Sequence, residues 1–332
     1  MTPKRLSRTW GRISNGASEG PRHAALAGPG RARFERSYAV KNVGHEPSAS
    51  GRVDLIALST GSLYSYGLNR VFDLAAQAGF QGIEVIVDQR WDTRQAHYLK
   101  ALQETYGIPI VSLHSPFVPG IQGWEPPGQL NHLKRTITLA QEVGARHVVA
   151  HLPFRFAETW LKVPWLRERP VLLRLPIPRN GDYRRFLIHG LQAYATAGVT
   201  VVVENLPCRK RLGLTYNGYQ MNTIAEWGSL PHLSFDTTHL ATWGHDVLAV
   251  YEQVKTRMAH VHLSNFNGQE HRLPWDGHIP LDELLRRLRR DAFAGIICVE
   301  LEPDPLWAQS EEKTKENLRR CYEFCLQYFG TP

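Results

Sequence analysis

The stretch Gly198-Val-Thr-Val-Val-Val-Glu-Asn-Leu-Pro207 contains the pattern that decides the fold. A glycine that can end a helix precedes a run of β-branched residues, and a carboxylate and a proline follow that run. A strand buried on both faces reads as such a continuous apolar run, whereas a strand with one wet face alternates apolar and polar residues. The stretch therefore predicts a buried parallel strand that leads directly into Glu204.

The same pattern recurs from residue 53 to the end of the chain. Strands are expected at Leu55–Leu58, Ile83–Val87, Ile110–His114, His147–His151, Val199–Val203, His232–Asp236, His260–Leu263 and Ile296–Glu300. Helices are expected at Leu68–Gly79, Ala96–Gly107, Leu130–Gly144, Tyr183–Gly198, Gln220–Trp227, Asp246–Val254, Leu281–Arg290 and Glu311–Phe329. Eight β/α units in a row predict one closed (β/α)8 TIM barrel over residues 53–332. No Gly-x-Gly-x-x-Gly turn follows the first strand, which weighs against an open dinucleotide-binding sheet.

Residues 1–52 form a basic segment that differs in composition from the barrel region. They contain ten Lys or Arg against three Glu, whereas the remaining 280 residues contain 29 basic and 28 acidic side chains. The segment is rich in Gly, Ser, Pro, Ala and Arg without an apolar period, so we predict a disordered leader. It lacks the apolar core of a secretory signal, and either a transit peptide or an overlong predicted start fits its composition. The nearly neutral barrel region makes nucleic acid an unfavourable partner.

The remaining composition predicts a globular protein of a reducing compartment. No apolar run reaches the roughly 18 to 20 residues of a membrane helix, so no membrane span is expected. The four cysteines form no Cys-x-x-Cys pair, which argues against a disulfide scaffold and favours the cytoplasm.

Polar residues stand at the ends of six consecutive predicted strands. They are His114, His151, Glu204, Asp236, His262 and Glu300. The carboxyl ends of barrel strands meet at one face, where such barrels hold their catalytic groups. Each residue alone could be an ordinary hydrogen-bonded or ion-paired side chain, but an unpaired buried charge is costly and a shared cation would compensate all of them. The mixture of carboxylate and imidazole indicates Mn²⁺, Zn²⁺, Co²⁺ or Fe²⁺ rather than Ca²⁺.

With these motifs the chain resembles the xylose-isomerase-like barrel superfamily, which includes sugar-phosphate isomerases, epimerases and endonuclease IV. The resemblance covers residues 53–328 and rests on Gly-Ile-Glu84-Val, Leu-His114-Ser-Pro, His151, Glu204-Asn, Asp236-Thr-Thr-His239, His262, His271-Arg-Leu-Pro-Trp-Asp-Gly and Glu300.

The resemblance implies two sets of residues for metal ions. Glu204, Asp236, His262 and Glu300 would be the shared ligands. The histidines that match sites for further zinc ions in endonuclease IV are His114, His151, His239 and His271. Endonuclease IV has an Asp two residues before the match to His271, where this chain has Gln269, which puts a full three-metal centre in doubt.

Two reactions fit this predicted site. In the first, a metal-dependent isomerase or epimerase of a sugar, sugar phosphate or polyol, Glu204 or Glu300 moves a proton beside a carbonyl while the metal stabilises charge, with His239 as a further catalytic group. A dehydratase or lyase is a close variant. In the second, an endonuclease IV-like phosphoester hydrolase, two or three ions activate water. A barrel that has lost activity would lack ligands, and all four are present.

A small-molecule substrate is expected to contact side chains around the predicted centre. His114, His151 and Trp275 are candidates, and so are three arginines in the segments after the fourth and fifth strands, Arg155, Arg209 and Arg211. Arginine forks near a metal would suit a phosphate or carboxylate of the substrate, although a solvated basic surface explains them equally well.

We predict that a protein beginning at Gly51 folds and keeps its activity, because residues 1–50 add no apolar surface to the core. Thermal unfolding of the full-length and shortened proteins, together with their activity, measures this. A large drop in melting temperature would mean that the leader is part of the fold.

Overall fold

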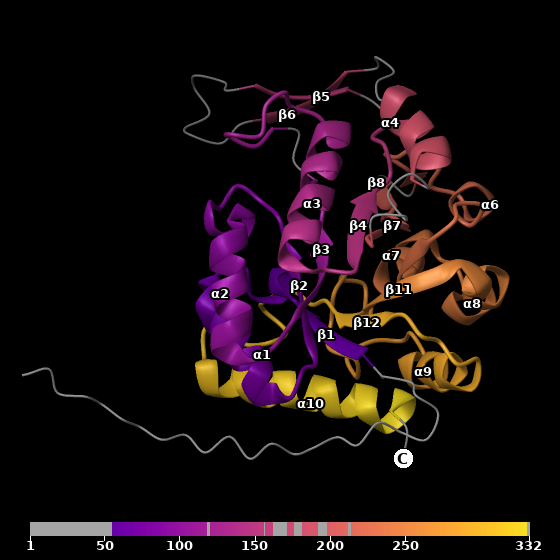
Figure 1. The fold of residues 1–332 in the computed structure, drawn as a ribbon. Coiled ribbons are helices and arrows are strands. Elements are labelled where there is room, and N and C mark those ends of the chain that lie inside the picture. Colours follow the sequence, from indigo (N-terminus) through magenta and orange to yellow (C-terminus); the bar gives the residue numbers. More distant parts are fainter. Residues whose placement is uncertain are drawn as a thin grey trace, which may run out of the picture. The chain divides into compact units, whose positions relative to one another are not determined.

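The computed structural model describes residues 55–117, 120–155, 157–161, 171–175, 181–191, 198–211 and 214–330. Eight parallel strands close into a barrel in the order β1-β12-β11-β10-β7-β4-β3-β2 (Figure 1). Their bounds are Leu55–Ser59 (β1), Gly82–Ile86 (β2), Ile110–His114 (β3), His147–His151 (β4), Thr200–Glu204 (β7), Leu233–Asp236 (β10), Met258–Leu263 (β11) and Ile296–Val299 (β12). The predicted TIM barrel is confirmed, and the predicted leader at residues 1–52 lies outside the described residues.

Helices surround the barrel on its outside (Figure 1). They are α1 (Leu68–Ala78), α2 (Ala96–Tyr106), α3 (Gln129–Val143), α4 (Gly181–Arg185), α6 (Ile224–Trp227), α7 (Thr237–Trp243), α8 (Val247–Val254), α9 (Leu281–Arg290) and α10 (Glu311–Phe329). The last helix, α10, packs against α1 and α9 and so joins the last β/α unit to the first. None of the helices in the described ranges has the length and apolar character needed to cross a lipid bilayer.

The barrel wall separates two hydrophobic clusters. Outward side chains such as Leu58 and Phe235 belong to the large cluster between strands and helices. A small inner cluster consists of Leu55, Ala57, Val111, Ile296 and Cys298. Because successive side chains of a strand point to opposite faces, the position after Ile296 and Cys298 on the same side is that of Glu300. The inward positions nearest the carboxyl ends are thus left to polar groups.

Two predicted helices differ clearly from the structure, and most predicted strand bounds shift by one or two residues. The helix expected at Tyr183–Gly198 consists of the short α4 and a π-helical segment at Phe186–Gly190, and residues 192–197 lie outside the described part. The helix expected from Gln220 begins only at Ile224 in α6, because the Thr223 hydroxyl caps it by accepting a hydrogen bond from the Glu226 amide. The last strand ends at Val299, one residue before the predicted end.

Three elements near the carboxyl ends of the strands were not predicted. The segment after β4 contains an antiparallel hairpin of β5 (Ala157–Leu161) and β6 (Val171–Leu175). The segment after β7 contains a second hairpin of β8 (Arg209–Arg211) and β9 (Leu214–Tyr216). The third element is α7, which begins directly after β10. All three follow strands that end on a predicted site residue.

Candidate metal centre

Four side chains from neighbouring strands converge at the carboxyl end of the barrel. Glu204 ends β7, Asp236 ends β10, His262 lies in β11, and Glu300 follows β12. One donor atom of each lies within 4.8 Å of the others. The Nδ1 atom of His262 lies 2.7 Å from Glu204 Oε1, 3.1 Å from Glu300 Oε2 and 3.8 Å from Asp236 Oδ2. The structure therefore brings together the four residues that the resemblance implies as ligands.

Charge in this group is concentrated and out of contact with water. His262 faces carboxylates on both sides, since its Nε2 atom lies 3.0 Å from Glu84 Oε1. Burial opposes protonation of His262, but Glu300, Glu84 and Glu204 together raise its pKa well above the ordinary value. Burial and the neighbouring carboxylate of Glu204 raise the pKa of Asp236 well above the ordinary value. Asp236 is thus the carboxylate of this group that tends to keep its proton. For Glu204, burial acts in the same direction, but His262, His114 and His151 together hold its pKa well below the ordinary value.

Two buried carboxylate oxygens of this group lack hydrogen bonds from the described residues. They are Glu204 Oε2 and Asp236 Oδ2. His151 Nε2 and His114 Nε2 face Glu204 Oε2 at 3.1 Å and 3.4 Å, without the geometry of a hydrogen bond. Buried polar atoms are nearly always satisfied, so orphaned oxygens beside imidazole nitrogens need an explanation. A divalent cation held by three carboxylates and an imidazole fits this donor set.

Four more histidines form smaller groups beside these carboxylates. His114 and His151 share Glu204, while His239 and His271 share Asp236, each group having its donor atoms within 4.8 Å. The Nδ1 atom of His114 lies 3.0 Å from the Ser115 carbonyl oxygen. Because a carbonyl can only accept, His114 Nδ1 carries a proton. Its Nε2 faces Glu204, and although burial opposes protonation, this carboxylate raises the pKa of His114.

Local hydrogen bonds around Asp236 hold β7, β10 and α7 together. The Asn205 side chain donates to the Asp236 carbonyl oxygen at 3.0 Å and accepts from the Asp236 amide at 2.9 Å. Asp236 also caps α7, because its Oδ1 accepts from the His239 amide at 2.7 Å. The Asp-Thr-Thr-His sequence therefore positions a carboxylate and a histidine through one tight helix start.

The centre opens into a cavity of about 900 Å³. Glu204, Glu300 and the histidines His114, His151, His239 and His271 line it. Its outer lining includes two exposed aromatic residues, Tyr64 and Phe117, which are 60% and 48% exposed. The outer lining also contains charged residues that sequence reasoning missed, namely Asp88, Arg90, Glu270, Arg272, Glu302 and Asp304. They lie in loops and not at the ends of predicted strands, so the pattern used to find site residues in the sequence does not include them.

Of the predicted substrate-binding arginines and tryptophan, only some line the cavity. Arg209 lines the cavity and forms an ion pair with Glu270. Arg155 is exposed, donates to the Tyr219 carbonyl oxygen, and is not among the lining residues. Trp275 is also not among them, and its ring lies under the guanidinium of Arg320 at 4.3 Å. The backbone of Arg211 lies in β8, and its side chain lies outside what the structure describes.

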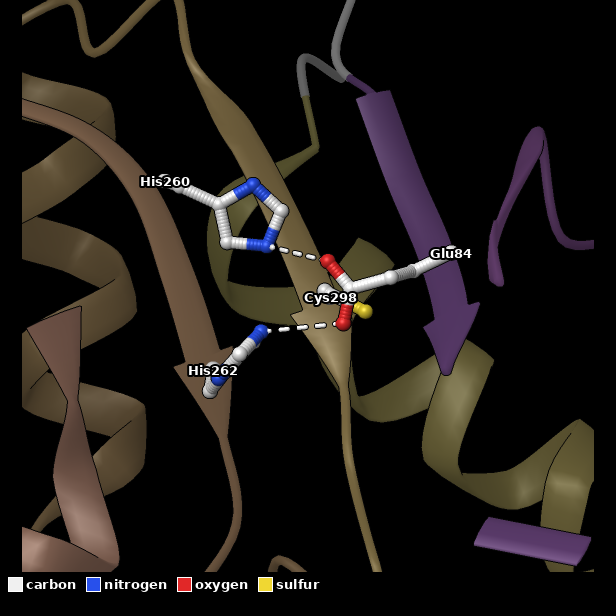
Figure 2. A group of neighbouring side chains, drawn as sticks. All are labelled: Glu84, His260, His262 and Cys298. Carbon is white, nitrogen blue, oxygen red and sulfur yellow. Dashed lines mark hydrogen bonds and ion pairs between the residues drawn. The ribbon is translucent and has the colours of Figure 1, made fainter. Parts of the chain in front are cut away.

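Glu84 is the buried site residue that the predicted ligand set lacked. It lies in the middle of β2 and is fully buried against β11 (Figure 2). The carboxylate contacts His260 and His262. The sequence did contain an indication of this role, because Glu84 is a charged residue inside the apolar run Ile83-Glu84-Val85. A charge buried in such a run needs a partner.

Comparison with known proteins identifies the family. The sequence matches the family described as xylose isomerase-like TIM barrel over residues 72–324. An uncharacterised protein of Mycobacterium leprae is 24% identical over 283 residues, which cover 78% of this chain and 92% of that protein. The rhizopine catabolism protein of Rhizobium meliloti is 25% identical over 285 residues, which cover 74% of this chain and 78% of that protein.

Solved structures share the fold at low sequence identity. The 3-keto-D-glucoside 4-epimerase of E. coli has a TM-score of 0.56 and 17% identity, covering 82% of this chain and all of that one (100%). The D-allulose 3-epimerase of Methylomonas sp., solved with D-allulose, has a TM-score of 0.58 and 14% identity, covering 83% and 98%. An AP endonuclease of family 2 from Brucella melitensis has a TM-score of 0.56 and 16% identity, covering 80% and 97%.

We predict that the double variant Glu204→Gln, Glu300→Gln loses its bound divalent metal, because two anionic ligands become neutral amides. Elemental analysis after dialysis against Mn²⁺ measures the ions per chain. The matched control Glu323→Gln changes an exposed glutamate of α10 and should keep the wild-type stoichiometry. Full occupancy in the double variant would contradict the proposed ligand set.

We also predict that loading the metal-free protein with Mn²⁺ near pH 7 releases protons. The raised pKa of His262 keeps its ring protonated in the metal-free protein, and a metal ligand must be deprotonated. Apparent affinity should therefore increase with pH until His262 is neutral in the metal-free protein. Calorimetric titration in buffers of different ionisation enthalpy counts the released protons, and identical heats in all buffers would refute the expectation.

Proposed function

The chain belongs to the xylose isomerase-like TIM barrel family, and from this premise we propose that it is a divalent-metal-dependent isomerase or epimerase of a sugar or related polyol. The main support is the pair of carboxylates from different strands, Glu204 and Glu300, that line one cavity beside Asp236 and His262. The same pair can move a proton beside a carbonyl, which is the step that isomerisation and epimerisation share.

The proposed cofactor is one divalent ion held by Glu204, Asp236, His262 and Glu300. Carboxylate and imidazole donors favour Mn²⁺, Zn²⁺, Co²⁺ or Fe²⁺. When bound, such an ion polarises a carbonyl or hydroxyl oxygen of the substrate and stabilises the negative charge that develops there.

The proton is moved by the two glutamates. One carboxylate removes it from the carbon beside the carbonyl, and the C–H electron pair becomes part of the new carbon–carbon double bond. Return of a proton to the opposite face of that carbon by the second carboxylate gives the epimer. Return to the former carbonyl carbon gives the isomer, provided that the hydroxyl proton of the first carbon also moves to the former carbonyl oxygen. Glu300 has 13% of its side chain exposed and Glu204 only 1%, so Glu300 is the more accessible of the two. The Ser59 hydroxyl lies 3.4 Å from Glu300 Oε1 and orients this carboxylate.

His239 is suited to hold a substrate hydroxyl group and to exchange its proton. Burial lowers the pKa of His239 to about 3, so the ring is neutral at pH 7. Its Nδ1 lies 2.9 Å from the Asn205 carbonyl oxygen and must therefore carry the proton. The Nε2 atom is left with a lone pair on a residue that lines the cavity.

The lining charges favour an uncharged substrate over a sugar phosphate. The arginines that line the cavity are already engaged by carboxylates: Arg90 pairs with Asp88, Arg209 with Glu270, and Arg272 with Asp276. A phosphate would compete with these partners, and Arg90 Nη2 is the guanidinium nitrogen of these three that is buried without a hydrogen bond from the described residues. The exposed rings of Tyr64 and Phe117 offer apolar surface to a sugar ring, and Phe117 stacks on His151 with centroids 5.6 Å apart. The two epimerases compared above are named for unphosphorylated sugars.

A phosphoester hydrolase is the second candidate. The groups His114–His151–Glu204 and Asp236–His239–His271 could each hold a further ion, and one similar structure is an AP endonuclease of family 2. Gln269 at the cavity lining weighs against this reading, because it stands where endonuclease IV has an aspartate.

We predict that the protein, incubated with a panel of ketohexoses and inososes in D₂O, incorporates deuterium at the carbon beside the carbonyl. Glu204→Gln and Glu300→Gln should each reduce this rate by about 10²- to 10⁴-fold, since general acid–base groups contribute about that much. Mass spectrometry and NMR follow the label, and Glu323→Gln again serves as the control.

Metal stoichiometry of the wild-type protein and of His151→Ala distinguishes the isomerase or epimerase from the phosphoester hydrolase. One ion per chain, retained in His151→Ala, is expected for the isomerase or epimerase. Two or three ions, partly lost in His151→Ala, with phosphodiester cleavage and no deuterium exchange, would overturn the proposal in favour of hydrolysis.

A further inference from the structure

We infer that Glu84 is a positioning residue that fixes the tautomer and orientation of His262, so that Nδ1 of this ring is presented to the metal. This inference rests on the proposed metal centre but not on the identity of the reaction. Glu84 comes from β2, on the other side of the barrel from the strands that supply the candidate ligands. None of the residues assigned above to metal or substrate supplies this contact.

The Glu84 carboxylate is surrounded by donors. Its Oε1 lies 3.0 Å from His262 Nε2, and its Oε2 accepts from the Ser112 hydroxyl at 2.8 Å. His260 Nε2 lies 3.2 Å from the same Oε2. Glu84, His260 and His262 are each 0% exposed. Figure 2 shows the two imidazoles on one strand reaching the two oxygens of one carboxylate.

Both ring nitrogens of His262 face carboxylates, Nε2 that of Glu84 and Nδ1 those of Glu204 and Glu300. A carboxylate only accepts, so when a cation occupies the proposed centre the one proton of the neutral ring belongs on Nε2, beside Glu84, and the lone pair on Nδ1. Nδ1 is the atom that faces Glu204 and Glu300. A histidine that ligates a metal commonly donates its other N–H to a carboxylate, which also raises its strength as a ligand.

The alternation of strand side chains makes the contact possible. His260 and His262 are two residues apart on β11 and so point into the barrel together. Their rings lie at 89° with centroids 4.9 Å apart, which lets one carboxylate meet both. His260 thus lies beside Glu84 on the side away from the metal centre, at ion-pair distance but without the geometry of a hydrogen bond.

A second metal ion is the competing reading of the same residues. Glu84, His260, His262 and Cys298 have one donor atom each within 4.8 Å of one another. The Ser112 hydroxyl and the His262 ring already compensate the carboxylate through hydrogen bonds of ordinary length. An ion here would also compete with the first centre for His262. We therefore favour positioning.

The test measures Co²⁺ binding to Glu84→Gln, which keeps the side-chain shape but directs an amide N–H at one of the imidazoles. We expect Co²⁺ affinity, measured by competition with a chromogenic chelator, to decrease about 10- to 100-fold, as for other residues that support a metal ligand. The visible absorption spectrum of bound Co²⁺ should change, because the orientation of one ligand is altered.

Two variants serve as matched controls. Glu323→Gln should bind Co²⁺ as the wild-type protein does. Cys298→Ser keeps the Glu84–His262 contact and should bind one Co²⁺ ion with wild-type affinity.

A further measurement separates positioning from a general effect on stability. In Zn²⁺-loaded protein with ¹⁵N-labelled histidine, His262 should show a protonated Nε2 and a metal-bound Nδ1, and Glu84→Gln should lose this protected N–H. If Glu84→Gln fails to fold, Glu84→Asp replaces it, since the shorter carboxylate cannot reach both rings and should also weaken Co²⁺ binding.

Unchanged Co²⁺ affinity and spectrum in a folded Glu84 variant would overturn the inference. It would equally be overturned by two Co²⁺ ions per chain, one of them lost in both Glu84→Gln and Cys298→Ser. Wild-type protein that binds no Co²⁺ would refute both the metal centre and the inference. Co²⁺ binding that depends on Glu84, without deuterium exchange in any sugar, would refute the proposed reaction alone.

Discussion

Compensation of buried negative charge is the constraint on which the site depends. Glu84, Glu204 and Asp236 are almost completely buried, and an isolated carboxylate in such surroundings would be strongly destabilising. One imidazole, that of His262, lies between all of them and Glu300. Imidazoles of His114, His151 and His260 also face Glu204 or Glu84. Glu204 Oε2 and Asp236 Oδ2 are nevertheless without hydrogen bonds from the described residues, so the four clustered carboxylates leave a deficit of positive charge at the carboxyl end of the barrel. That deficit, more than any one distance, is the reason to propose a cation there.

The barrel and much of its polar centre could be predicted because their signals are periodic. Continuous β-branched runs mark strands that are buried on both faces, and each run led to a polar residue at the same end. Glycines at 79, 107 and 144 adopt the left-handed backbone that ends a helix, as their positions before the next strand predicted. The β/α repeat thus identifies strand ends without any knowledge of contacts.

Features that depend on contacts between distant segments could not be predicted in this way. Glu84 lies inside an apolar run, and only the closure of β2 near β11 shows that two histidines surround it. The pairing of Arg209 with Glu270 joins residues 61 positions apart and changes how an arginine near the cavity is interpreted. The fold shared with epimerases and an AP endonuclease leaves the chemistry open, because these proteins are under 20% identical to this chain. The assignment of a reaction therefore depends on side chains within the cavity.

The hydrogen bond that begins α7 has a consequence for ion selectivity. Asp236 Oδ1 accepts a hydrogen bond from the His239 amide, whereas Oδ2 has none from the described residues, so Oδ2 is the oxygen best placed to bind a cation and Asp236 would act as a monodentate ligand. A large ion such as Ca²⁺ relies on six to eight oxygens and often on both atoms of a carboxylate. With one oxygen of Asp236 bonded to the backbone, the proposed site would discriminate by the number of carboxylate oxygens it offers and would favour small ions of low coordination number. Ionic radius would then be selected by a helix cap rather than by the width of the cavity.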